Sequence, residues 1–384
     1  MKKLTLGALI VLALTACSIT EPELQENEKL PAITANSGDF VVKTPDVEIV
    51  KNPVVFTVLN AGDFLTGPEI NRYFAPNSYN YSSLLEPALP AVESADLAVC
   101  HLEILSSSTG PSFVMREAPV FTNPYSTLQQ LKNYGWDACS AASNHSMDGG
   151  FSAIQDTRKS ASEAGIQITG VSDSDEGAGP LLITLEKDGV ELTIGIVSYT
   201  WALNGLSKPA GKPWAVNTFS RFDLSTLNPL IEDARTARAE GADVVMASVH
   251  CCQEYITTPS ASQIAISEYI AESGEVDVLI GHHPHTPQPI NMISGGPNNQ
   301  GMWVAYSIGN YTSYLGKAWT DIGILSLTDF TVSPEDGSVS TNMRYTTITT
   351  SWDGGLHTIL GGDSNTISSV MTGSDASYQS FAGE

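Results

Sequence analysis

Short apolar runs alternate with amphipathic segments along most of the chain. The runs that predict buried strands cover residues 54–59, 95–103, 137–142, 191–199, 243–250, 276–280 and 303–307. The segments with apolar residues at helical spacing cover residues 82–94, 126–134, 152–164, 224–240 and 260–273. This alternation of strands and helices predicts an α/β fold whose strands pair largely in parallel.

Polar side chains follow the predicted strands at the points where these strands end. They are Asp63, Glu103, Asn144, His145, His250, His283 and His285. Because the carboxyl ends of strands in α/β sheets lie along one rim, where ligands bind, we expect these side chains to converge. Three of the chain's seven histidines fall within residues 282–285. Imidazoles at this density indicate metal binding or proton transfer.

The residue types at this rim suit a catalytic metal site. Carboxylate, amide and imidazole ligands are typical of Mn, Fe or Zn, and their number exceeds what one ion needs. We therefore expect two divalent ions, bridged by a carboxylate and a water. Taken alone, Asp63 is better explained as a turn residue and Asn144 as a helix cap. Glu103 is different, because a carboxylate that ends a buried strand needs a partner.

Six short motifs occur in a defined order along the chain. They are Ala61-Gly62-Asp63, His101-Leu102-Glu103, Ser143-Asn144-His145 and the segments 249–255, 280–288 and 306–311. In this order they resemble the CapA family of capsule and poly-γ-glutamate synthesis proteins, which is related to the calcineurin-like metallophosphatases. The resemblance covers residues 54–329 and implies a four-layer αββα sandwich of the metallophosphatase type, with a dinuclear metal site.

The resemblance also implies a role for each rim residue. The metal ligands would be Asp63, Glu103, Asn144, His250, His283 and His285, with Glu103 as the bridging carboxylate. His145 would be the general acid or a transition-state stabiliser. Residues expected to support the ligands or line the pocket are His101, Glu254, His282, Tyr306 and Asn310. His101 could donate a hydrogen bond or add a ligand, and ordinary packing explains Glu254, Tyr306 and Asn310 equally well.

The chain departs from the family pattern at several positions. His101 and Ser143 stand where the family usually has asparagine, and Cys251-Cys252 replaces Trp-Gly after His250. The Asp-x-His motif of metallophosphatases is reduced to Asp63, with leucine in place of the histidine. We therefore expect one of the two metals to be held more weakly than the other.

The first 17 residues resemble a bacterial lipoprotein signal. Two lysines precede an apolar run that is too short to span a bilayer, and Leu14-Thr15-Ala16-Cys17 resembles a lipobox. The prediction is an exported protein, lipidated at Cys17 and held at the extracytoplasmic face of the membrane. A plain secretory signal or a buried first strand is the alternative. Residues 18–52 would form a flexible stalk, residues 53–329 the main domain, and residues 330–384 a peripheral strand and a Ser/Thr/Gly-rich tail.

Composition narrows the list of partners and says little about cysteine pairing. The 384 residues carry 42 acidic and 18 basic groups, a net charge of −24 that repels nucleic acid and attracts cations. Export permits disulfides, and Cys100, Cys139, Cys251 and Cys252 allow three pairings. Because neighbouring cysteines rarely bridge, we expect all four to be buried as small apolar residues.

Three functions remain open from the sequence. The first is a surface-anchored metallohydrolase of the CapA type that cleaves a phosphoester or amide bond in polymer synthesis or export, with a polyanionic polymer and capsule-synthesis membrane proteins as partners. The second is a non-catalytic, membrane-anchored scaffold that binds the polymer. The third, a lipid-anchored solute-binding protein, lacks its expected two-lobed repeat. The chain contains no G-x-S-x-G, H-E-x-x-H or G-x-G-x-x-G motif.

Overall fold

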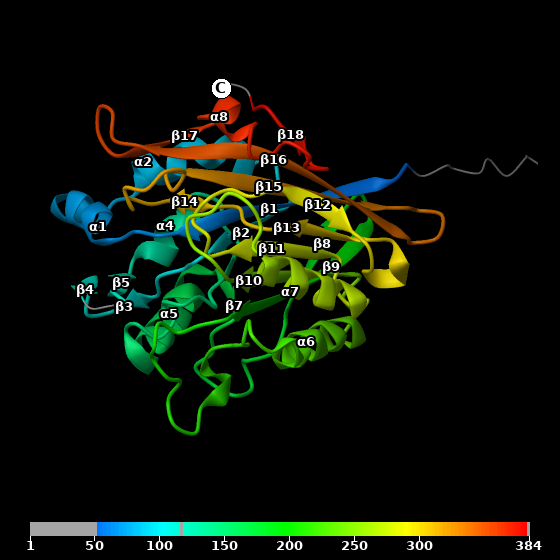
Figure 1. Cartoon of the computed structure of the whole chain (residues 1–384), viewed down its shortest axis with the longest axis horizontal. Coiled ribbons are helices and arrows are strands. Elements are labelled where there is room, and N and C mark those ends of the chain that lie inside the picture. Colours follow the sequence, from blue (N-terminus) through cyan, green and yellow to red (C-terminus); the bar gives the residue numbers. More distant parts are fainter. Residues whose placement is uncertain (1–51, 116–117, 382–384) are drawn as a thin grey trace, which may run out of the picture. The chain divides into compact units, whose positions relative to one another are not determined.

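The computed structural model describes residues 52–115 and 118–381, so the predicted leader, Cys17 and nearly all of the predicted stalk lie outside it. In the described part, two mixed β-sheets face each other, with helices on their outer sides (Figure 1). Over these residues, no helix combines the length and apolarity that crossing a membrane requires.

The first sheet contains most of the strands that precede the predicted rim residues. Its nine strands are β1 (Val54–Phe64), β2 (Leu97–His101), β6 (Ala138–Ser140), β7 (Gln167–Thr169), β14 (Asn310–Thr312), β15 (Ile322–Val332), β16 (Val339–Ser351), β17 (His357–Leu360) and β18 (Ser377–Tyr378). The main path runs β17-β16-β15-β1-β2-β6-β7, with β14 beside β1 and β18 beside β16. Strands β1, β2, β6 and β7 are parallel, as predicted, whereas β15, β16 and β17 add antiparallel pairs.

The second sheet leads to four of the clustered histidines, His250, His282, His283 and His285. Its strands are β8 (Leu181–Lys187), β9 (Val190–Thr200), β10 (Val244–His250), β11 (Val278–His282), β12 (Ile290–Ile293) and β13 (Met302–Ala305). The order is β12-β13-β11-β10-β9-β8, parallel from β13 to β9 and antiparallel at both edges. A small third sheet consists of β3 (Ser106–Ser107), β4 (Ser112–Val114) and β5 (Val120–Pro124).

Helices cover the outer faces of the two large sheets. The first sheet packs on α1 (Pro68–Phe74), α2 (Ser82–Leu85), α3 (Leu89–Val92), α4 (Thr127–Asn133) and α5 (Gly150–Ala164). The second packs on α6 (Asn228–Ala239) and α7 (Ala261–Glu272). A separate apolar core lies between the sheets and includes Phe56, Val99 and Ile194. The layers are therefore αββα, as the resemblance implied.

Short helical segments account for the remaining turns. They are α8 (Ser364–Ile367) and the 3-10 helices η1 (Ala75–Asn77), η2 (Glu86–Ala88), η3 (Pro213–Ala215), η4 (Leu224–Leu227) and η5 (Pro297–Asn299). The helix predicted over residues 82–94 is instead the broken series α2, η2 and α3. Pro87 and Pro90 lie in this series, and proline removes the backbone donor that a continuous helix needs.

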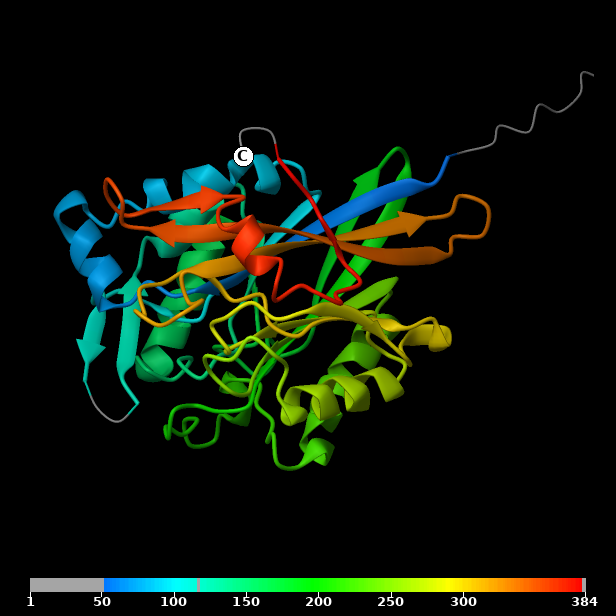
Figure 2. The ribbon, with the colours of Figure 1, turned by 45° about the horizontal axis from the view of Figure 1, so that its top comes forward.

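Residues after 329 belong to the first sheet. The predicted boundary at residue 329 falls inside β15, and β16 covers Val339–Ser351. Strands β15 and β16 pair along their full length beside β1 (Figure 2). Over the described residues, the segment 330–381 thus completes the sheet instead of forming a separate tail.

All four cysteines of the described chain are buried, as predicted, but they are bonded in pairs. Cys100 and Cys139 face each other on the parallel strands β2 and β6, with their Cα atoms 4.5 Å apart, which lies within the range that a disulfide spans. Cys251 and Cys252 form a second disulfide between neighbours. The expectation of free, apolar cysteines is therefore wrong.

Candidate metal centre

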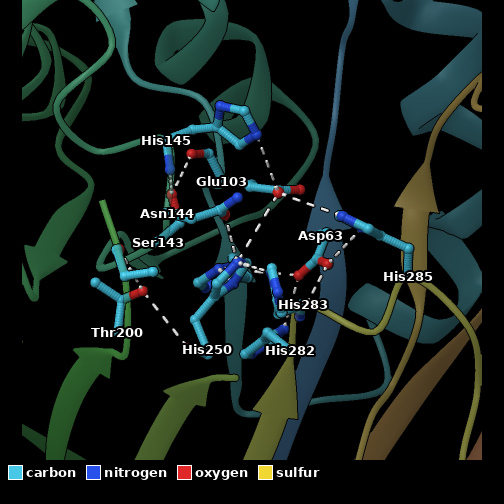
Figure 3. Close-up of polar contacts among 12 residues, drawn as sticks. Asp63, Glu103, Ser143, Asn144, His145, Thr200, His250, His282, His283 and His285 are labelled. Atoms are coloured by element: carbon cyan, nitrogen blue, oxygen red, sulfur yellow. Dashed lines mark hydrogen bonds and ion pairs between the residues drawn. The ribbon is translucent and has the colours of Figure 1, made fainter. Parts of the chain in front are cut away.

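The rim residues from both sheets converge in one buried cluster (Figure 3). Asp63 lies near the end of β1, Glu103 follows β2, and Asn144 and His145 follow β6. His250 ends β10, and His283 and His285 follow β11. The carboxyl ends of strands in facing sheets thus bring together side chains that are far apart in the sequence.

Glu103 lies at the middle of this cluster. Its Oε1 atom is 3.7 Å from His285 Nε2, 3.9 Å from His250 Nε2 and 3.9 Å from His145 Nε2. These distances exceed those of hydrogen bonds, and neither carboxylate oxygen has a hydrogen-bond partner although the side chain is fully buried. A buried carboxylate without a partner is costly, so its surroundings fit a bound cation.

Asp63 is held by backbone contacts and faces two imidazoles. Its backbone N–H donates to Gly309 O at 2.9 Å. The preceding Gly62 approaches Gly309 so closely that a Cβ atom there would collide with the Gly309 carbonyl. The Oδ1 atom lies 3.1 Å from His282 Nδ1, and Oδ2 lies 3.1 Å from His285 Nδ1. Glycine at residue 62 is therefore part of what positions the carboxylate.

A second group of ligand atoms surrounds His250. Its Nε2 atom is 2.7 Å from Asn144 Oδ1 and 3.1 Å from His283 Nδ1. Its other ring nitrogen, Nδ1, is 3.0 Å from His101 Nε2, which fixes the orientation of the ring. His283 and His285 have φ values of 90° and 59°, which are uncommon for residues with a side chain and concentrate at functional sites.

Three sets of side chains have ligand atoms within 4.8 Å of one another: Asp63, Glu103 and His285; Asp63, His101 and His250; and Glu254, His283 and His285. The first set agrees with the ligands implied by the sequence. The other two add His101 and Glu254, neither of which belongs to the ligand set that the resemblance implies. Nitrogen and oxygen donors of this kind fit divalent Mn, Fe or Zn.

Burial and mutual charge shift the pKa values of the cluster in opposite directions. Burial raises the pKa of Glu103 to about 7 and lowers that of His283 to about 3. Burial also lowers the pKa of His250 well below its usual value. It acts in the same direction on His285, but the carboxylates of Glu103 and Asp63 outweigh it and raise the pKa to about 10. His250 and His283 are thus neutral near pH 7, as metal ligands must be.

His145 is oriented by a carboxylate that the sequence analysis missed. Its Nδ1 atom is 2.6 Å from Asp148 Oδ2, and its other nitrogen, Nε2, faces Glu103. The Ser143 hydroxyl accepts a hydrogen bond from the His145 backbone at 3.0 Å. An imidazole held by a carboxylate in this way is suited to proton transfer. In the sequence, the contact between His145 and Asp148 was indicated only by their spacing of three residues within a turn.

The remaining predicted residues divide into two groups. His101 and His282 stack behind Asp63, with ring centroids 3.9 Å apart, and Asn310 Oδ1 lies 3.0 Å from His285 Nδ1. Tyr306 was expected to line the pocket at the metal centre, and the structure places it elsewhere. Although it directly follows β13, Tyr306 lines a small separate cavity together with Cys251 and Cys252.

Comparison with known proteins identifies the family. A family model described as bacterial capsule synthesis protein PGA_cap matches residues 57–314. The chain belongs to this family. The resemblance to CapA proteins noted in the sequence is thereby confirmed.

Two curated relatives are about a quarter identical to this chain over the aligned residues. PGA biosynthesis protein CapA of Bacillus subtilis (strain 168) is 27% identical over 209 residues, which cover 53% of this chain and 49% of that protein. Capsule biosynthesis protein CapA of Bacillus anthracis is 26% identical over 195 residues, which cover 50% and 44%. A solved structure of the calcineurin-like phosphoesterase YfkN from Bacillus subtilis has a TM-score of 0.48 at 13% identity and covers 83% of this chain and 97% of that one. The chain spans about half the length of the two CapA relatives.

Proposed function

We propose that this protein is a metal-dependent hydrolase that acts in the synthesis or export of a capsule or poly-γ-glutamate-type polymer. The observation that carries the proposal is the fully buried Glu103 carboxylate, which has no hydrogen-bond partner and faces three imidazoles at 3.7–3.9 Å. Asp63, Glu103 and His285 would hold one ion, and Asn144, His250 and His283 the other. When bound, such ions stabilise negative charge on a phosphoryl or tetrahedral transition state.

The chain's own residues supply the proton transfer. His145 is placed to donate a proton from Nε2 to the oxygen or nitrogen that leaves, while Asp148 holds the opposite nitrogen and keeps the ring in position. The Asn204 side chain contacts both residues. Its Nδ2 atom lies 3.4 Å from His145 Nδ1, and its Oδ1 atom accepts a hydrogen bond from Asn144 Nδ2. This network links the proton donor to a candidate metal ligand, so both keep a fixed geometry relative to the substrate.

Hydrolysis assays separate this proposal from the alternative of a non-catalytic scaffold. The metal-loaded domain is tested with bis(p-nitrophenyl) phosphate and with a γ-glutamyl anilide. His145→Ala and Asp148→Asn should lower kcat about 10²–10⁴-fold while bound metal is retained. Asp175→Asn, on an exposed loop after β7, is the control. No turnover of either substrate with any divalent ion would favour the scaffold, and variants as fast as the wild type would refute the role of His145 in proton transfer.

We further propose that the protein is held at the outer face of the membrane by a lipid on Cys17. The support is the basic start, the short apolar run and the lipobox-like ending at Cys17. A Cys17→Ser variant should move from the membrane fraction to the soluble exported fraction. Retention of that variant on the membrane would show that the anchor lies elsewhere.

A further inference from the structure

A cavity of about 520 Å³ lies directly beside the candidate metal centre. Asn144, His145 and His285 line one part of it, so a substrate whose scissile bond reaches these side chains must place an adjoining group in the rest of the cavity. The other lining residues include Leu65, Phe121 and Leu315, whose side chains are apolar. The chemistry of these walls therefore bears on what that adjoining group is.

One apolar wall runs from the protein surface to the proton donor. Phe113, on β4, is 40% exposed and stacks on Phe121, with ring centroids 5.4 Å apart. The Phe121 ring in turn meets the His145 ring at 5.1 Å. Met115, also in the lining, is 73% exposed. Large apolar side chains exposed together around a pocket are typical of ligand-binding sites.

A second group of exposed aromatic rings begins at another residue of the cavity lining. Tyr314 lines the cavity and lies 4.8 Å from Trp352, which lies 5.4 Å from Tyr73. Tyr73 lies on α1, Tyr314 follows β14, and Trp352 lies in the turn between β16 and β17. In both ribbon views, α1 and this turn lie at the same end of β1 as β4, which carries Phe113 (Figures 1 and 2). Each of these three rings is between 40% and 52% exposed. A ring-shaped group would thus find aromatic faces inside the cavity and at its rim.

The charges around the cavity disfavour an anionic occupant. Its charged lining residues, apart from the histidines, are Glu69 and Glu254, and no lysine or arginine is among the described residues that line it. The nearby Lys317 ammonium lies 3.5 Å above the Tyr255 ring. Each residue of a polyglutamate chain carries a carboxylate. Binding of this chain in the cavity would bring these carboxylates toward Glu69 and Glu254, and repulsion between like charges would oppose it.

We infer that this cavity binds an uncharged, ring-bearing group on the leaving side of a phosphoester, rather than a segment of polyglutamate. The inference rests on the proposed hydrolytic function and narrows its substrate class. In the reaction, water adds to phosphorus and the bond from phosphorus to the ring-bearing oxygen breaks. His145 gives its proton to that oxygen, and the proton that the water loses restores His145. The products are a neutral alcohol and a phosphate that carries the other group.

Binding of phosphonates tests this inference without turnover. With the metal-loaded protein, phenylphosphonate should bind about 10- to 100-fold more tightly than methylphosphonate in calorimetry, because the ring buries apolar surface. Tyr314→Ala should reduce this ratio several-fold and leave methylphosphonate binding unchanged. Tyr314→Phe, which keeps the ring, should retain the ratio. Tyr378→Ala, at a similarly exposed ring outside the cavity lining, is the matched control.

The outcomes distinguish this inference from the proposed function itself. Equal affinity for the two phosphonates, or a γ-glutamyl oligomer that binds more tightly than phenylphosphonate, would overturn the inference even if the protein hydrolyses phosphoesters. A ratio unchanged in Tyr314→Ala and in Phe113→Ala would also overturn it. Failure to bind metal, or to hydrolyse either an ester or an amide, would instead refute the proposed function.

Discussion

Replacing Glu103 by glutamine should stabilise the metal-free protein while weakening metal binding. Burial raises the pKa of Glu103 from its ordinary 4.5 to about 7. Between these values the folded protein binds more protons than the unfolded chain, so stability falls as the pH rises through this window. Holding the ionised carboxylate at pH 8 thus costs about 3 kcal/mol of the free energy of unfolding, and at pH 5 less than about 1 kcal/mol. Glutamine has nearly the same shape and remains neutral.

Denaturant unfolding of chelator-treated protein at both pH values measures this difference. Glu103→Gln should be more stable than the wild type by about 3 kcal/mol at pH 8 and nearly equal at pH 5. Adding Mn²⁺ or Zn²⁺ should reverse the order, because only the wild type gains the full stabilisation from binding. Glu335→Gln, on an exposed loop, should change neither value. A less stable Glu103→Gln protein at pH 8 without metal would refute the reasoning.

Three further predictions follow from the same geometry. The pKa values of Glu103 and His285 are raised to about 7 and about 10, so both groups carry protons near pH 7. Metal binding at pH 7 should therefore release between one and two protons per chain, and it should weaken as the pH falls. Calorimetry in buffers of different ionisation enthalpy measures this proton release. The double replacement Cys100→Ala, Cys139→Ala should lower the free energy of unfolding by about 4 kcal/mol, because the disulfide closes a sequence separation of 39 residues; equal denaturation midpoints would contradict this. Gly62→Ala should cost roughly 1–3 kcal/mol and reduce metal affinity, since its Cβ would collide with the backbone that positions Asp63, and an unchanged affinity in titrations would contradict it.

The convergence of the site could be predicted because its residues share a local signal. Asp63, Glu103, His250 and His283 each lie at or just after the end of an apolar strand, and parallel pairing brings such ends together. The αββα layering came from the resemblance rather than from the periodicity of the strands. Local sequence patterns were thus sufficient to predict the convergence of the site, because the same few residues determine both the direction of the strand and the position of the side chain at its end.

Other features had no local signal. A strand was predicted within residues 330–384, but the polar composition of β16, with buried threonines such as Thr346 and Thr347, did not indicate that it packs inside the sheet. The Cys100–Cys139 bond depends on the register of β2 and β6, which composition does not determine. The aromatic lining around Phe113 and the strip of Tyr314, Trp352 and Tyr73 come from segments that only the tertiary fold brings to one end of β1.

Metal content is the most direct test of the central claim that this cluster holds two divalent ions. Metal analysis of the purified domain at pH 8, after loading with Mn²⁺ or Zn²⁺ and removal of free ions, should give close to two ions per chain. His283→Ala should retain about one, and Tyr306→Phe, outside the cluster, should retain two. Less than one ion per chain in the wild type, or equal content in wild type and His283→Ala, would contradict the account.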